Sequence, residues 1–83
     1  MKVLYFARLR EKAGTAEEDV SPPAEVMDVG GLIGWLRDRG GGPAAALADL
    51  STVRIAVNRE HAGLDHAVGP DDEVAFFPPV TGG

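Results

Sequence analysis

The residues whose types and spacing could support chemistry lie at the end of the 83-residue sequence, which runs Phe77-Pro78-Pro79-Val80-Thr81-Gly82-Gly83. Two prolines favour an extended backbone, and glycines can enter a channel too narrow for any side chain. They would deliver a terminal carboxylate at Gly83, which adenylation by ATP would turn into an acyl donor. Sulfur could then replace one oxygen, so the sequence predicts a tail able to carry sulfur as a thiocarboxylate.

Other reactive groups are scarce in this sequence. It has no cysteine, which excludes disulfides, thiolate metal sites, cysteine nucleophiles and persulfide carriers. His61 and His66 lack the spacing of a metal motif, and the acidic run 71–73 lacks the spacing of a calcium loop. The glycine run 40–42 is not followed by the Lys-Ser/Thr pair of a phosphate-binding loop. We therefore predict no metal site and no cofactor bound by this chain.

Composition limits the partners and the compartment. The net charge is −5, so the chain should repel nucleic-acid backbones. Hydrophobic residues make up 45% and charged residues 25%, as in an ordinary globular domain. No apolar run approaches the ~20 residues that a membrane span needs. We expect a cytoplasmic protein with neither a nucleic-acid nor a membrane partner.

The pattern of apolar residues predicts the elements that must position the tail. Period-two alternation predicts strands at 2–8, 17–20, 53–57 and 74–77, with a very short one around Leu64. A helix is predicted over 28–39, where apolar residues recur at helical spacing after Asp28 as N-cap. One helical turn is expected at 9–13, a break at 40–43, and a second short helix at 44–50.

This order predicts an α+β domain, a mixed sheet with one main helix packed on one face, which is the β-grasp arrangement. We place the domain at residues 1–78 and a flexible tail at 79–83.

Strand alternation also predicts an exposed apolar surface. If Val3 and Val74 face the helix, Phe6 and Phe77 lie on the opposite face, which a one-helix sheet leaves uncovered. The two rings would be exposed together if the first and last strands are neighbours, and such surface typically binds a partner. The alternatives are the opposite register or cover by residues 59–66.

The sequence resembles the small subunits of molybdopterin synthase, the sulfur carriers of molybdenum-cofactor biosynthesis. The resemblance covers essentially the whole chain. Its most specific part is the C-terminal run from Asp72 to Gly83. Supporting segments are Val3-Leu4-Tyr5-Phe6-Ala7, Arg10-Glu11 with Gly14, Ala56-Val57-Asn58 and Asp65-His66.

The resemblance implies a ubiquitin-like β-grasp fold and a defined chemistry. A separate E1-like adenylyltransferase, using ATP, would adenylate Gly83, which is then thiocarboxylated. The chain would pair with the large synthase subunit, usually in a heterotetramer, and give its sulfur to the pterin precursor to form the dithiolene. It would be a non-catalytic, sulfur-donating subunit, with the catalytic residues on the large subunit.

The resemblance also implies which residues bind the partner. These are Phe6 and Phe77 on the sheet, and the tail residues Pro78, Pro79, Val80, Thr81 and Gly82. A third contact position of the family, often apolar, falls on His61 here.

Three other functions stay open. Thiamine-pathway sulfur carriers share the fold and the terminal glycines but usually lack the Phe-Phe-Pro-Pro run. A ubiquitin-like modifier would form isopeptide bonds with lysines, and the same acyl-adenylate serves both chemistries. A β-grasp binding module would have no terminal chemistry. Processing of the tail distinguishes these functions.

Overall fold

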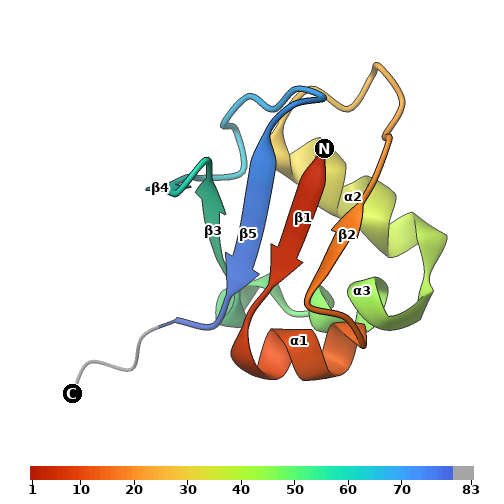
Figure 1. The fold of residues 1–83 in the computed structure, drawn as a ribbon, viewed down its shortest axis with the longest axis vertical. Helices are drawn as coiled ribbons and strands as arrows, with labels where there is room; N and C mark the ends of the chain where they lie inside the picture. The colour runs from red at the N-terminus through yellow and green to blue at the C-terminus, as the bar shows by residue number, and fades with distance from the viewer. Residues whose placement is uncertain (80–83) are drawn as a thin grey trace.

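The structure is a computed structural model that describes residues 1–79, and its strands form one five-stranded mixed sheet (Figure 1). The strand order is β2-β1-β5-β3-β4. The elements in chain order are β1 (Lys2–Tyr5), α1 (Ala7–Ala13), β2 (Glu17–Asp19), α2 (Val29–Arg39), α3 (Gly41–Ala46), the 3-10 turn η1 (Leu50–Thr52), β3 (Arg54–Val57), β4 (Glu60–His61) and β5 (Glu73–Phe77).

The last strand lies in the middle of the sheet. β5 pairs in parallel with β1 and antiparallel with β3, and its Phe76 stands opposite both Tyr5 and Ile55. β2 and β4 are the short edge strands, each antiparallel to its neighbour. The predicted ubiquitin-like β-grasp, a mixed sheet with one main helix packed on one face, is confirmed.

Helix α2 forms where its apolar spacing predicts. The side chain of Asp28 caps it by accepting a hydrogen bond from the Gly31 amide at 2.7 Å. The stripe of four apolar side chains is buried against the sheet: Val29, Leu32, Ile33 and Leu36. Burial of that stripe compensates for the weak helix propensity of the glycines in α2.

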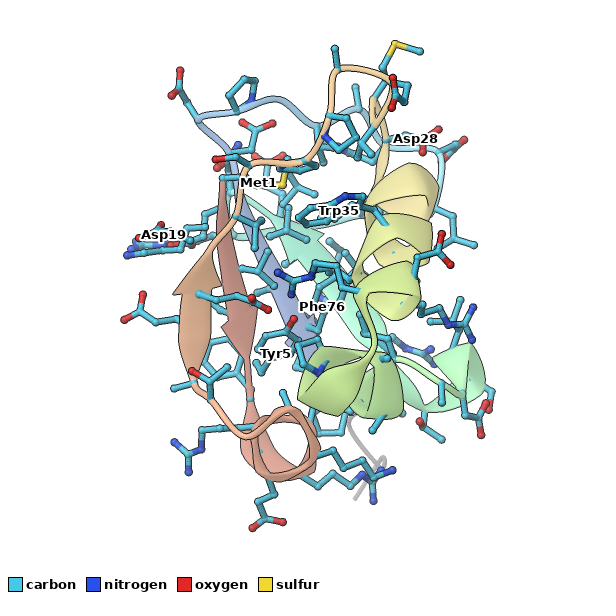
Figure 2. All side chains as sticks on the ribbon, turned by 90° about the vertical axis from the view of Figure 1, so that its right-hand side faces the viewer. Met1, Tyr5, Asp19, Asp28, Trp35 and Phe76 are labelled. Carbon is cyan, nitrogen blue, oxygen red and sulfur yellow. The ribbon has the colours of Figure 1, made fainter. Side chains whose placement is uncertain are left out.

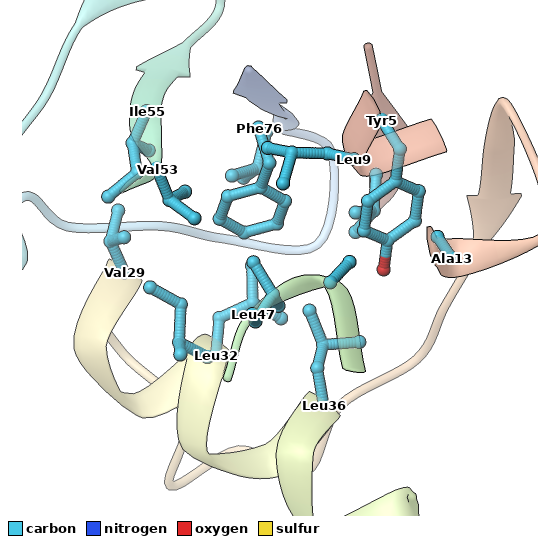
Figure 3. Close-up of a cluster of buried hydrophobic side chains, with 14 of the residues drawn as sticks. Tyr5, Leu9, Ala13, Val29, Leu32, Leu36, Leu47, Val53, Ile55 and Phe76 are labelled. Carbon is cyan, nitrogen blue, oxygen red and sulfur yellow. The ribbon is translucent and has the colours of Figure 1, made fainter. Parts of the chain in front are cut away.

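The core fills the space between α2 and one face of the sheet. Figure 3 shows Leu32, Leu36 and Leu47 gathered beneath the rings of Tyr5 and Phe76. Those two rings stack with centroids 5.9 Å apart, and Phe76 is completely buried. Aromatic pairs in this geometry stabilise a core beyond their buried area.

The first strand is shorter than predicted. It ends at Tyr5 instead of residue 8, because the backbone turns at Phe6 and Ala7 and Ala7 takes a left-handed φ of 52°. The single helical turn expected at 9–13 is instead a seven-residue helix, α1, whose Leu9 and Ala13 are buried. Gly14 ends it with a φ of 79°, a conformation that favours glycine.

A break was expected over residues 40–43, and it is only one residue long: Gly40 ends α2 with a φ of 77°, as predicted for a helix stop, and the next helix begins at once. Residues 41–46 form α3, so the helix predicted at 44–50 begins and ends earlier. A Cβ on Gly42 would collide with the carbonyl oxygen of Ala13, at the end of α1. Glycine at 42 therefore permits a close approach of α1 and α3, which is a role in packing.

The very short strand is also displaced. It lies at Glu60–His61, and Leu64 is in the following loop. Asn58 and Arg59 both have positive φ, 50° and 71°, as in a tight two-residue hairpin turn. The chain therefore returns along β3 immediately, several residues before the position predicted.

Within residues 1–79, no helix has the length and apolarity to cross a bilayer. The predicted boundary between domain and tail stays a prediction, because residues 80–83 lie outside the described part of the chain.

Candidate functional site

The face of the sheet opposite α2 is apolar at its centre. We call it the outer face and define it by six residues: Leu4, Phe6, Ala56, His61, Ala75 and Phe77. Alternation along β5 explains it, because Val74 and Phe76 are buried while Ala75 and Phe77 are partly exposed. Figure 2 shows Tyr5, Phe76 and Trp35 between the sheet and α2, and Asp19 on the other side. Among residues 1–79, no helix covers the outer face.

Phe6 lies beside the end of β5, because the first and last strands are neighbours, which was the condition for Phe6 and Phe77 to be exposed together. Its amide donates to the carbonyl oxygen of Phe76 at 3.0 Å, and its own carbonyl accepts from Leu9 and Arg10 at the start of α1. The backbone is thus held between β5 and α1, while the residue is 48% exposed. The predicted register is confirmed, and Phe6 and Phe77 share one side of the sheet.

His61 completes one edge of the outer face. Its ring meets the ring of Phe77 edge-on, with centroids 5.8 Å apart, and its backbone pairs with Ala56 on β3. Both histidine and phenylalanine leave part of their surface exposed. The two rings therefore form an exposed aromatic surface with a polar edge, a combination typical of interfaces between proteins.

The alternative explanation was cover of the outer face by residues 59–66, and of these only His61 is seen against it, at its edge. The carbonyls of Leu64 and His66 accept hydrogen bonds from Gly30 at 2.8 Å and Val29 at 3.0 Å, at the start of α2. The loop is thereby bound to the helical side of the molecule.

The tail begins directly from this surface. Phe77 is the last residue of β5, and Pro78 and Pro79 follow it partly exposed. The other predicted tail residues, Val80, Thr81, Gly82 and Gly83, lie outside the described residues. Partner binding by Phe6, Phe77 and the tail, and acyl chemistry at Gly83, therefore stay predictions.

A hydrogen-bonded anchor that the sequence analysis missed holds the β3–β4 turn. The Asn58 side chain donates to the Asp72 carboxylate at 2.9 Å and accepts from the Glu73 amide at 3.0 Å. The bond from Asn58, and then one from the Gly69 amide, lower the pKa of Asp72 below its usual value. The signal was an asparagine, a residue that tolerates positive φ, directly after a strand.

A second hydrogen-bonded group that the sequence analysis missed joins two strands and a helix, at the end of the core away from the β3–β4 turn. The Tyr5 hydroxyl donates to Glu18 at 2.7 Å, and Glu18 also accepts from Arg39 at 2.9 Å. Burial of the ring, and then this hydrogen bond, raise the pKa of Tyr5. The group ties β1, β2 and α2 together and lies on the buried side of the sheet, away from the outer face.

Two other features could mark a site: clusters of potential metal ligands, and a groove away from the outer face. Within residues 1–79, no group of three or more potential ligands is arranged to hold a metal ion. A groove of about 460 Å³ lies at the N-terminal end of β1, lined among others by Met1, Pro23 and Met27. None of the predicted site residues lines it, so it does not belong to the site.

Comparison with known proteins gives consistent relatives. The profile of the ThiS family matches residues 3–83. The molybdopterin synthase sulfur carrier subunit of Escherichia coli (strain K12) is 41% identical over 83 residues, which cover all of this chain and 99% of the relative. Small archaeal modifier protein 1 of Haloferax volcanii is 38% identical over 89 residues, covering all of both chains.

A solved structure supports the same architecture. The solution structure of small archaeal modifier protein 1 from Methanosarcina acetivorans matches with a TM-score of 0.73 and 29% identity, over 99% of this chain and 94% of that chain.

Proposed function

Because the chain belongs to the ThiS family, we propose that it serves as the sulfur carrier subunit of molybdopterin synthase. The observation that carries the proposal is the full-length similarity to a protein of that name, together with the exposed Phe6–Phe77 surface from which the tail starts. The predicted resemblance to the small subunits of molybdopterin synthase is confirmed.

The chemistry takes place at Gly83. Its carboxylate attacks the α-phosphorus of ATP on an E1-like adenylyltransferase, pyrophosphate leaves, and a glycyl adenylate forms. A sulfur nucleophile at the oxidation level of sulfide then attacks the acyl carbon, AMP leaves, and a thiocarboxylate remains. Where the sulfur comes as a donor protein's persulfide, a second thiol reduces the acyl disulfide, forms a disulfide with the donor's cysteine and releases the thiocarboxylate. This chain supplies the acyl group, and ATP is bound by the activating partner.

The large synthase subunit is the second partner. The outer face docks on it, usually in a heterotetramer of two small and two large chains, while the tail delivers sulfur to the pterin precursor in the large subunit's active site. Glycines at 82 and 83 suit this role, since they have no side chain to obstruct a narrow channel. Catalytic residues belong to the large subunit, and this chain acts as the donor.

A specific observation also favours a second function, covalent protein modification. The similarity to small archaeal modifier protein 1 extends over the whole of both chains. In a modifier, a lysine amine of the target would attack the glycyl adenylate in place of sulfur, forming an isopeptide bond and releasing AMP. Both functions require the same activated Gly83.

Intact-mass measurement distinguishes these functions. After co-expression with the activating enzyme and a sulfur source, the carrier should gain the mass of one oxygen replaced by sulfur and form product with the large subunit. Isopeptide adducts alone would indicate a modifier, and an unprocessed chain would indicate a binding module. Product only with thiazole-forming enzymes would indicate the thiamine pathway.

Two tail variants serve as matched controls. A chain lacking Gly83 should fold and bind the large subunit but form no product, because its terminal carbonyl falls up to ~3.5 Å short of the reacting atom. A chain extended by one bulky residue should fail because a side chain then occupies the channel. Full product formation by the chain lacking Gly83 would refute the carrier function.

A further inference from the structure

The charges of this molecule are separated along the sheet. Six of the eight basic residues lie at the end where β5 finishes (Figure 1): Arg8, Arg10, Lys12, Arg37, Arg39 and Arg54. Eight of the thirteen acidic residues lie at the opposite end: Asp19, Glu25, Asp28, Glu60, Asp65, Asp71, Asp72 and Glu73. The other five acidic residues, Glu11, Glu17, Glu18, Asp38 and Asp49, lie nearer the end from which the tail starts, so that end has a small positive excess while the opposite end is strongly acidic.

Three arginines flank the root of the tail. Arg54 stands opposite Phe77 in the β3–β5 register and is exposed. Helix α1 follows Phe6 and contacts β5, and it exposes Arg8 and Arg10. We call Arg8, Arg10 and Arg54 the basic rim, because they border the Phe6–Phe77 surface.

Within the part of the chain that the structure describes, the three arginines of the basic rim form no ion pair. Lys2 pairs with Glu17 at 3.3 Å and Arg39 with Glu18 at 2.9 Å, whereas no acidic group of residues 1–79 pairs with Arg8, Arg10 or Arg54. Exposed charges without partners at the edge of an apolar patch are suited to pairing across an interface.

The position of the rim indicates what it faces. Six residues from Pro78 to Gly83 can span up to about 20 Å, so a tail extended into a partner's site would place its end beyond the reach of the rim. The rim therefore lies too far from the reacting atoms to bind an anionic substrate there. In such a complex it would lie against the protein surface that surrounds the opening.

We propose that the large synthase subunit presents carboxylates around the opening that receives the tail, and that the basic rim pairs with them. This inference depends on the proposed function and adds how the two proteins find the correct orientation. An acidic surface attracts the basic rim and repels the acidic opposite end of the carrier, so encounters bring the tail to the opening first. The pairing acts mainly on the association rate, as rim charges do.

The test compares two charge reversals near the ends of β3. Arg54→Glu alters the rim, and Arg59→Glu makes the same charge change in the exposed turn after β3, away from the rim. Stopped-flow association with the large subunit, without substrate, should be slowed about threefold by Arg54→Glu at low salt. Reversal of all three rim arginines should slow it about tenfold or more. Arg59→Glu should change the rate by less than about twofold.

Salt and conservative substitution separate charge from packing. The wild-type association rate should fall steeply with ionic strength, and the triple reversal should lose that dependence. Replacing the three arginines by lysine should keep the rate and its salt dependence. Circular dichroism confirms that each variant is folded.

Two results would overturn the inference while the proposed function stands. One is an equal effect of Arg54→Glu and Arg59→Glu on association. The other is unchanged association with reduced sulfur transfer, which would place the rim on an anionic substrate. If the wild-type chain failed to bind the large subunit at all, the proposed function would fail and this inference with it.

Discussion

Strands β1 and β5 each have one face buried in the core and one face partly exposed. On the inner face, Val3, Tyr5, Val74 and Phe76 are almost wholly buried under α2, and the rings of Tyr5 and Phe76 stack. On the outer face, their chain neighbours Leu4, Ala75 and Phe77 are only partly covered. A period of two thus divides one short segment into residues that hold the fold and residues free to bind.

Adjacent phenylalanines in this chain therefore have opposite surroundings, one buried in the core and one partly exposed. Phe76 and Phe77 are chemically identical and one residue apart. Their different surroundings predict that truncating one affects folding and truncating the other affects binding.

The largest effect should come from the inner face. Phe76→Ala leaves a cavity among fully buried side chains and should lower the free energy of unfolding by about 3–5 kcal/mol. Phe77→Ala is the matched control and should lower it by less than about 1 kcal/mol. Urea denaturation followed by circular dichroism measures both, and equal losses would show that the two faces are not distinct.

The next effect concerns binding through the outer face. Phe77→Ala and Phe6→Ala should each raise the dissociation constant for the large subunit by about 30-fold or more, since central aromatic anchors often contribute over ~2 kcal/mol. Leu64→Ala removes an exposed side chain outside the outer face and serves as control. Calorimetric titration gives the constants, and unchanged affinity with lower stability would place these rings in the core.

Alanine substitutions at two glycines should distinguish the effect of helix packing on stability from the effect of intrinsic helix propensity. Gly42→Ala forces a methyl group against the carbonyl of Ala13 and should lower the free energy of unfolding by about 1–3 kcal/mol. Gly34→Ala meets nothing within 4 Å and should raise it by up to about 1 kcal/mol. Thermal unfolding measures both, and stabilisation by Gly42→Ala would contradict the close approach of α1 and α3.

The smallest effect should be a dependence of folding stability on pH, caused by Asp72 beside the β3–β4 turn. The lowered pKa of Asp72 means that its bonds to Asn58 and Gly69 add stability above the carboxyl's unfolded pKa. That stability is lost as the pH falls through the folded pKa. Asp72→Asn should therefore destabilise the protein at pH 7 more than at pH 3, by urea denaturation. An equal difference at both pH values would exclude the carboxylate as the cause.

Local patterns predicted the parts of the fold that depend on neighbours in the sequence. The stripe from Val29 to Leu36 after Asp28 indicated α2, and alternation around Phe76 indicated which ring would be buried. The pairing of β1 with β5, on which the shared position of Phe6 and Phe77 depended, entered only as a condition, because pairing between strands far apart in the sequence leaves no local signal.

The errors arose where distant residues decide the local backbone. Residues 41–46 form a helix packed against α1, and Gly42 permits that approach because a Cβ there would meet Ala13, far away in the sequence. Ala7 ends the first strand through a left-handed φ that alanine seldom adopts, which propensity does not indicate. Asn58 fixes the turn through a bond to Asp72, so β4 begins earlier than composition alone suggested.

The central position of β5 has a mechanical consequence. Because β5 pairs with β1 on one side and β3 on the other, a pull on the tail loads both hydrogen-bonded ladders at once and along the strand direction. The bonds then share the force in shear, whereas a tail leaving an edge strand could peel that strand away bond by bond. In the proposed function, the tail could therefore be withdrawn repeatedly from a narrow channel without the last strand being pulled out of the sheet.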